Sequence, residues 1–437
     1  MKAIQEIFSL LRSKVTGHSA TEIGWVIFGQ SINVLLGFII IKFISKTGPE
    51  QYGVYALILT IAAFIGLFYG SFLQGFLRYY YHYEEINQRD GFVLLMFRFI
   101  RITIIILIAI TLIISVLTPL IDKSYTFAFF LFAGLFIITS KISEFFNSTL
   151  NLLRKRKENS LLQALERLLM IIVLLAFVIF NYLDLINILL AFACISFLLA
   201  FLKIITFRKF VSINKTTSTQ SNLQKEIVRT VLIYISPFLI WGIAGWLQLN
   251  GEKWIINAIL STNDVGIYAI MMAIVNALVV IPNNIITEFA TPIIFKQFAN
   301  IENKENINIG RTYIRINTIL IMLITIIATM LTFLWGDEII RLISSDNYVK
   351  HWKILPLLVL GTGLFYVGQT QTLLGMGLSK PQKYIAPKLI LGIGSIGLNL
   401  FFISTFGFKG ISYSILLIGL MYVIYISIVN QRILRIS

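Results

Sequence analysis

Residues 92–118 read FVLLMFRFIRITIIILIAITLIISVLT, and from Ile102 onward this stretch holds no charged residue. A bilayer core of roughly 30 Å is crossed by about 20 apolar helical residues, so the run is long enough to span it. The whole chain has the same character, because 57% of its 437 residues are hydrophobic and 13% are charged, with a mean hydropathy of +0.86. This composition excludes a globular domain with a polar surface and indicates an integral membrane protein.

Similar runs recur along the chain, and they are continuous rather than alternating, which favours helices over a barrel. We expect an all-α polytopic protein of about twelve transmembrane helices. The expected helices are 22–46, 52–77, 92–118, 125–153, 161–182, 184–207, 230–260, 264–294, 312–335, 354–377, 383–405 and 409–431. The polar stretch after the sixth helix divides them into an N-terminal lobe (1–207), a cytoplasmic linker (208–229) and a C-terminal lobe (230–437).

The 36 basic residues fall mainly on one side of this topology, namely the two ends and every second break. The strongest cluster is the run Arg154–Lys157. Because cytoplasmic loops are enriched in Lys and Arg, both termini are predicted to be cytoplasmic. The same preference, together with attraction to anionic lipids, explains the net charge of +16 without a nucleic-acid partner.

Two short motifs occur once in each half of the chain. Gly53-Val-Tyr-Ala-Leu57 recurs as Gly266-Ile-Tyr-Ala-Ile270, and Phe99-Ile-Arg-Ile-Thr103 recurs as Tyr313-Ile-Arg-Ile-Asn317 at nearly the same offset. Six helices separate the copies, so both copies would have the same orientation in the membrane. The pattern predicts two parallel six-helix repeats, which is an architecture of transporters.

The order of further motifs resembles the polysaccharide flippase (Wzx, O-antigen transporter) family of the superfamily that also contains the MATE drug exporters. The resemblance covers nearly the whole chain and is carried by 47–56 (TGPEQYGVYA), 75–79 (GFLRY), Glu252-Lys253 and 260–268 (LSTNDVGIY). It implies an inner-membrane protein with two lobes that open alternately to either side. The implied cargo is an undecaprenyl-pyrophosphate-linked oligosaccharide. Family members often have Asp-Arg where this chain has Glu252-Lys253, so bidentate geometry is lost there.

Lys141 lies deep in the fourth predicted helix, and a cation within a bilayer is costly enough to mark a candidate site. Glu144 stands three residues on and Asn147 six residues on, so the three share a helix face. One reading is a self-neutralised pair buried between helices. The other makes Lys141 a phosphate ligand, with Glu144 coupled to its binding and Asn147 extending the polar stripe.

Lys253 lies about 10 Å into the seventh predicted helix, where it would either extend to the interface or contact phosphate. Glu252 is its neighbour in sequence. Since adjacent residues point to different sides of a helix, we do not expect these two charges to neutralise each other directly. Glu252 is therefore a candidate for ion coupling.

Four arginines lie near predicted cytoplasmic helix ends: Arg78, Arg98, Arg101 and Arg315. Anchoring in the headgroup region is one explanation for them. Alternatively, they line the cytoplasmic mouth and capture the pyrophosphate, for which guanidinium geometry is well suited.

Glu288 follows Pro282-Asn-Asn and has no basic residue near it in its own helix. Either it is a coupling site for H⁺ or Na⁺, or a partner on another helix balances its charge. Gln30, Asn33 and Gln74 are intramembrane polar groups that would bind sugar hydroxyls or bond neighbouring helices.

Other classes remain open at this stage. The chain shows no HExxH, phosphate loop, paired catalytic carboxylates or Cys/His metal spacing, so a polysaccharide polymerase or ligase is the weaker class, and no enzyme, cofactor or metal is expected. A MATE-like drug or ion antiporter is the nearest rival, although the deepest charge of the first half is the cation Lys141. Expected partners are membrane lipids and the lipid-linked oligosaccharide, with H⁺ or Na⁺ and polysaccharide polymerase machinery as further candidates.

Overall fold

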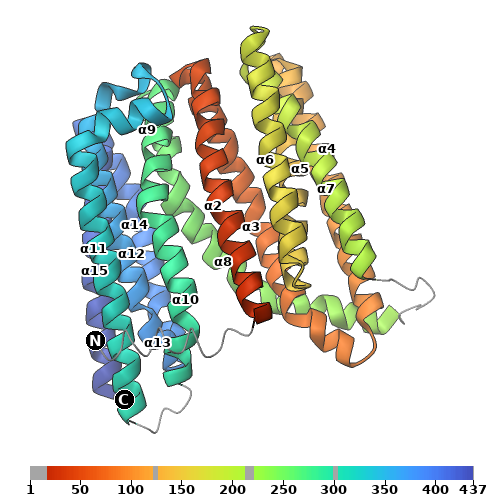
Figure 1. The fold of residues 1–437 in the computed structure, drawn as a ribbon, viewed down its shortest axis with the longest axis vertical. Coiled ribbons are helices and arrows are strands. Elements are labelled where there is room, and N and C mark those ends of the chain that lie inside the picture. The colour runs from red at the N-terminus through yellow and green to blue at the C-terminus, as the bar shows by residue number, and fades with distance from the viewer. Residues whose placement is uncertain (1–16, 122–125, 212–220, 299–303, 437) are drawn as a thin grey trace. The chain divides into compact units, whose positions relative to one another are not determined.

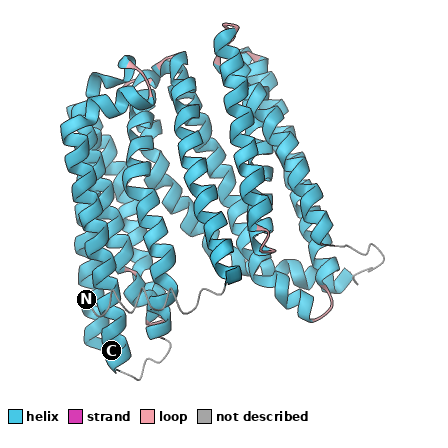
Figure 2. Ribbon diagram, in the orientation of Figure 1, coloured by secondary structure: helices cyan, strands magenta, loops and turns pink. Residues whose placement is uncertain are grey.

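The computed structural model describes residues 17–121, 126–211, 221–298 and 304–436, and in these ranges all regular structure is helical (Figures 1 and 2). The first helices along the chain are α2 (Gly17–Ile44), α3 (Pro49–Glu85), α4 (Arg89–Ile121), α5 (Phe127–Leu152), α6 (Arg156–Ile179) and α7 (Leu185–Phe210). The following helices are α8 (Ser221–Ile259), α9 (Thr262–Val275), α10 (Ile281–Gln297), α11 (Lys304–Ile343), α12 (Leu355–Gln371), α13 (Leu373–Gly377), α14 (Ile385–Phe406) and α15 (Phe408–Ile436).

The predicted all-α membrane fold is confirmed, and each predicted span coincides with an observed helix or helix pair. Within the described ranges, ten segments are long and apolar enough to cross a membrane. Helices α2 and α8, of 28 and 39 residues, match the other two predicted spans. One of the ten segments joins α9 to α10, and another joins α12 to α13.

Several helices run beyond the apolar segment that predicted them. Helix α11 spans Lys304–Ile343 and is kinked at Trp335, where φ is −128° and ψ is 24°, so it begins before the apolar run 312–335 and the end of that run coincides with the kink. Hydropathy marks only the part in hydrocarbon, while backbone hydrogen bonds continue the helix into the polar region. For the same reason the predicted linker 208–229 is helical at both ends, since α7 ends at Phe210 and α8 begins at Ser221; residues 212–220 lie outside the described ranges.

Two helix starts have a local chemical cause. Thr126 caps α5 by accepting a hydrogen bond on its hydroxyl from the Phe129 amide, at 3.3 Å. Asp184 caps α7 in the same way, with the Ile186 amide donating to its carboxylate at 3.1 Å. These caps satisfy amides that have no partner in the first turn of a helix.

The chain divides into two compact units by its internal contacts, and each is described separately. The first consists of 1–44 and 61–239, and the second of 45–60 and 240–437. In the first unit, α5 packs against α7, α2 against α6, and α4 against α5. A cluster of buried aromatics holds α3 and α4 together, including Phe92 of α4, on which Phe76 and Tyr83 of α3 both stack.

In the second unit, α12 packs against α15 and α11, and α14 packs against α15. The start of α3 belongs to this unit, where its Gly53 meets Gly266 of α9. A Cβ atom on Gly53 would lie 2.0 Å from the carbonyl oxygen of Thr262, and one on Gly266 would lie 1.9 Å from that of Pro49. The two copies of the repeated motif therefore contact each other through glycines that allow their backbones to touch.

The junction between α9 and α10 departs from regular α-helix. A single π-helical turn, Asn276–Val280, joins the two helices, and Pro282 lies in the first turn of α10. Such a turn and a proline both interrupt the regular ladder of backbone hydrogen bonds.

Candidate functional site

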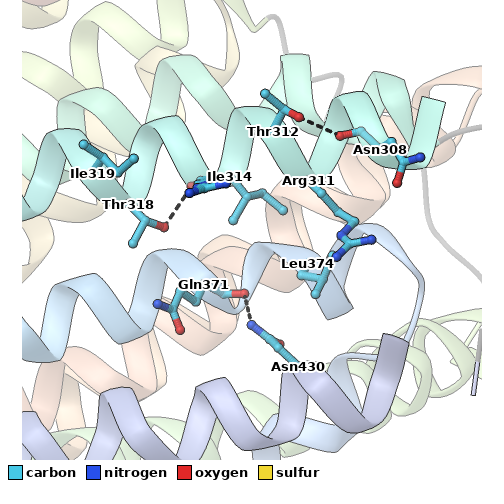
Figure 3. A pocket seen from close by; sticks show the side chains of 10 residues that line it. Asn308, Arg311, Thr312, Ile314, Thr318, Ile319, Gln371, Leu374 and Asn430 are labelled. Carbon is cyan, nitrogen blue, oxygen red and sulfur yellow. Dashed lines mark hydrogen bonds between the residues drawn. The ribbon is translucent and has the colours of Figure 1, made fainter. Parts of the chain in front are cut away.

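The candidate site is a cavity of about 580 Å³ in the second unit, bounded by α11, α12, α13 and α15 (Figure 3). Arg311 and Arg315 stand four residues apart on α11, so they lie on one face of that helix, and both side chains are exposed. Gln371 ends α12, and Asn430 comes from α15. Figure 3 shows Arg311 on the same side of α11 as these two carboxamides.

The carboxamides are held in place by their neighbours. Asn430 donates through Nδ2 to the backbone oxygen of Gln371 at 2.9 Å, and Ser427 donates to Oε1 of Gln371 at 3.0 Å. With its oxygen occupied, Gln371 retains its NH₂ group as a donor. Among the described residues that line the cavity, none is acidic. Two guanidinium groups and an amide donor suit an anion with several oxygens, such as a phosphate or pyrophosphate.

Arg315 was predicted as a candidate for anion capture, and the structure places it in this cavity. Arg311 was missed, although its spacing of four residues from Arg315 was a usable signal. The other three predicted arginines are exposed in the first unit, Arg78 on α3 and Arg98 and Arg101 on α4.

The predicted pairing of Lys141 with Glu144 is present on α5, with 2.6 Å between Nζ and Oε2. The lysine side chain is 15% exposed and the glutamate 65%. Gly66 of α3 makes room for the lysine, because a Cβ there would lie 3.2 Å from Nζ. On the same stripe, the Asn147 Oδ1 atom is buried and accepts no hydrogen bond from any described residue. The lysine is thus partly buried beside a carboxylate that solvent or ligand can reach.

The expectation that Glu252 and Lys253 do not neutralise each other was wrong. Their Oε1 and Nζ atoms lie 3.7 Å apart, which is within the range of an ion pair. Tyr268 of α9 also donates to Glu252 Oε1, at 3.3 Å, and Glu252 is buried. Its Oε2 atom has no hydrogen-bond partner within the described residues. These contacts fix α8 to α9 and reduce the net charge that Lys253 offers to a ligand.

A buried charged cluster in the first unit was not predicted. Lys203 of α7 lies 2.7 Å from Glu166 of α6, and its Nζ also donates to Ser143 of α5 at 2.6 Å. Ser143 and Ser196 donate to the two carboxylate oxygens of Glu166, at 3.0 and 3.1 Å. All groups in the cluster are satisfied, so it binds three helices together without leaving a free charge. Opposite charges inside two consecutive predicted helices were the signal for it.

The remaining predicted polar residues are Asn33, Gln74, Gln30 and Glu288, and the structure places them in different surroundings. Asn33 of α2 donates to Gln163 of α6 at 2.9 Å, which is the interhelical alternative considered for it. Gln74 is exposed on α3, and the side chain of Gln30 lies outside the described part of the structure. Glu288 is exposed on α10 and makes no ion pair with another described residue.

Known structures share this fold. The chain superimposes on the lipid II flippase MurJ in an inward closed conformation with a TM-score of 0.69 and 15% sequence identity, covering 93% of this chain and 87% of that one. A MATE transporter from Vibrio cholerae superimposes with a TM-score of 0.65 and 14% sequence identity, covering 100% of this chain and 99% of that one. A transporter of the MOP superfamily from Pyrococcus furiosus superimposes with a TM-score of 0.60 and 13% sequence identity, covering 94% of this chain and 93% of that one. At these identities the likeness shows the fold, which is the two-lobe MATE-like transporter fold.

The family follows from a different comparison. The family described as "Polysaccharide biosynthesis protein" matches residues 19–298, which is well over half of the chain. A comparison of the chain with individual curated proteins found no match. The chain belongs to the polysaccharide biosynthesis protein family.

Proposed function

We propose that this protein is a flippase that moves an undecaprenyl-pyrophosphate-linked oligosaccharide across the cytoplasmic membrane by alternating access. The observation that carries the proposal is the cavity of Figure 3, in which two exposed arginines and a carboxamide donor gather without an acidic residue among the described lining. Membership of a polysaccharide biosynthesis family and a fold shared with a lipid II flippase support the same reading.

In this mechanism Arg311 and Arg315 capture the pyrophosphate at the cytoplasmic side. A unit charge about 4 Å from another contributes roughly 4 kcal/mol at an effective dielectric of 20, so two guanidinium groups offset a substantial part of the desolvation of a pyrophosphate. Guanidinium groups also bind two oxygens at once. The polyprenyl chain remains in lipid while the charged headgroup moves through a hydrated path.

The other predicted cations have secondary roles in the proposal. Lys141 is a second phosphate ligand, because phosphate could replace the exposed carboxylate of Glu144 beside it. Lys253 is the weaker candidate, since buried Glu252 balances its charge. Arg78, Arg98 and Arg101 form the cytoplasmic mouth of the N-terminal lobe.

The proposed setting is the cytoplasmic membrane, with both termini cytoplasmic and lobes of 1–207 and 230–437. No covalent bond of the substrate is made or broken, so the protein is not an enzyme. Glu288 couples transport to an H⁺ or Na⁺ gradient, and the delivered glycan is passed to polysaccharide polymerase machinery.

A test of the function uses a deletion strain complemented with variants of the full chain. Loss of the protein is expected to leave lipid-linked oligosaccharide on the cytoplasmic leaflet. The double variant Arg311→Gln, Arg315→Gln should reproduce this accumulation, whereas lysine at both positions should restore part of transport. Arg341→Gln is the matched control, because this arginine lies near the opposite end of α11 and outside the cavity.

Two results would reject the proposal. Normal surface glycan in the double variant, at normal protein abundance, would exclude the arginine pair as the capture site.

The second candidate function is a MATE-like antiporter, favoured by the fold shared with the Vibrio cholerae transporter. Efflux of a cationic dye that depends on this protein, without accumulation of lipid-linked oligosaccharide in the deletion strain, would support the antiporter instead.

A further inference from the structure

A second cavity in the same unit, of about 420 Å³, is bounded by α8, α10, α12, α13 and α14. Its polar lining includes Gln248, Asn284, Thr287, Gln369 and Lys388. The described residues that line this cavity include no acidic residue and one basic residue, Lys388. Helices α8, α10 and α14 and the α12–α13 junction therefore contribute carboxamides, hydroxyls and one ammonium group to one space.

The polar groups of this cavity are only partly satisfied by the protein. The hydroxyl of Thr287 is buried and has no hydrogen-bond partner in the described part of the chain. Gln369 accepts from Tyr422 at 2.8 Å, which orients its NH₂ group and leaves that group able to donate. Among the described residues, the side chain of Asn283 has long hydrogen bonds, at 3.3 Å to Asn284 and 3.4 Å from Thr370. Buried groups left without partners are costly, so the cavity favours a ligand or water that supplies them.

The lining also defines the charge and size of the ligand. A cation is disfavoured by Lys388 and by the lack of a carboxylate among the described lining residues, and the carboxamides disfavour a purely apolar molecule. Phe365 lines the cavity and stacks on Tyr422 with 4.6 Å between ring centroids, which adds an apolar wall. A cavity of this volume belongs to the range that holds one small ligand rather than a whole oligosaccharide.

The two cavities lie on either side of one helix break. Helix α12 ends at Gln371 and α13 begins at Leu373, with Thr372 between them. Gln371 and Leu374 line the arginine cavity, whereas Thr372 and Leu373 line the lysine cavity. One short segment therefore contributes lining residues to both cavities.

We propose that the second cavity is a subsite for one phosphate-bearing sugar of the glycan, with Lys388 binding the phosphate oxygens and the carboxamides binding the sugar hydroxyls. The proposal rests on the proposed function, because it assigns a place in the same protein to the part of the cargo next to the pyrophosphate. Lysine suits this task as a single flexible charge, whereas the arginine pair suits initial capture.

The test is ligand protection of a cysteine in the purified full chain in lipid nanodiscs. The chain has one cysteine, Cys194, so Cys194→Ser provides a clean background. Thr287→Cys reports on the lysine cavity and Thr312→Cys on the arginine cavity, and Gln248→Cys replaces the first reporter if that variant does not fold. The probes are N-acetylglucosamine 1-phosphate, N-acetylglucosamine and inorganic phosphate, with the rate of alkylation as the readout.

N-acetylglucosamine 1-phosphate is expected to slow alkylation at Thr287→Cys at least tenfold, and more than either fragment alone. Adding Lys388→Met should raise the concentration needed for protection at least tenfold, which corresponds to about 1.4 kcal/mol. Lys388→Arg should retain part of the protection. Methionine keeps much of the apolar side chain, so alkylation without ligand should stay unchanged and show that the cavity is intact.

Three results would overturn the subsite: protection unaffected by Lys388→Met, equal protection by inorganic phosphate alone, or no protection at either reporter of the lysine cavity. The deletion strain separates this outcome from failure of the proposed function. Accumulated lipid-linked oligosaccharide without protection would retain the flippase and remove the subsite. Protection that depends on Lys388, without accumulation in the deletion strain, would retain a sugar-phosphate site and remove the flippase.

Discussion

Replacing Lys203 with methionine is expected to destabilise the protein by roughly 3–5 kcal/mol, the range for removing one partner of a buried ion pair. The Lys203 side chain has no exposed surface, and Glu166 is 13% exposed. The substitution would leave Glu166 with only the hydroxyls of Ser143 and Ser196 as partners. The free energy of unfolding can be measured in bicelles by steric trapping, with the same lipid composition for each variant.

The control is the same substitution at Lys141, which also pairs with a glutamate at short distance. Its partner Glu144 is 65% exposed, so solvent can stabilise the carboxylate that is left behind. We expect Lys141→Met to cost about 1 kcal/mol or less. The double variant Lys203→Met, Glu166→Met should recover most of the lost stability, because a well-packed apolar pair can replace a buried ion pair.

The reasoning is refuted by two patterns of results. A loss below about 1 kcal/mol for Lys203→Met would show that the buried carboxylate does not depend on its lysine. A double variant no more stable than the single one would place the effect in packing rather than in the unpaired charge.

Three further predictions concern topology, ion coupling and helix contact. In a cysteine-free background, a cysteine at exposed Lys157 should resist an impermeant thiol reagent in intact cells and one at exposed Asn347 should react; the opposite pattern would reverse the proposed orientation. Glu288→Gln should remove the dependence of transport on imposed H⁺ or Na⁺ gradients at normal abundance, and unchanged dependence would exclude this carboxylate from coupling. Gly53→Ala should lower the thermal unfolding temperature, whereas Gly37→Ala should not, because a Cβ at Gly37 meets no atom within 4 Å; equal effects would contradict the proposed close contact.

The fold was predictable because the bilayer requires long apolar runs and internally satisfied backbone, and both leave a simple mark on the sequence. The Lys141–Glu144 pair was predictable for a related reason, since its two members lie one turn apart on one helix. The ends of the helices were harder to predict from the sequence. Helix α11 begins at Lys304, among polar residues that hydropathy does not assign to a span, and it is kinked at Trp335, the residue at which the predicted span ends.

The candidate site was predicted only in part, because its members come from different helices. Arg315 was identified, but Gln371 and Asn430 join it only after α12 and α15 pack together. Lys388 lies near the start of a predicted helix, where a basic residue is ordinarily interpreted as a topology signal. The error at Glu252 and Lys253 arose from judging the pair by the directions in which neighbouring residues leave a helix, whereas long flexible side chains allow their charged ends to approach to 3.7 Å.

The contact between Gly53 and Gly266 has a consequence for the history of the chain. Each glycine belongs to one copy of the duplicated motif, and each lacks the atom that would collide with the backbone of the other copy. In a homodimer, a residue meets its own copy in this way only beside the two-fold axis. If the gene arose by fusion of two equal halves, this contact has the form of an ancestral dimer interface. Each added Cβ would meet backbone atoms of the other copy, so a change at one glycine could not be compensated by a change at the other, and the contact requires both glycines.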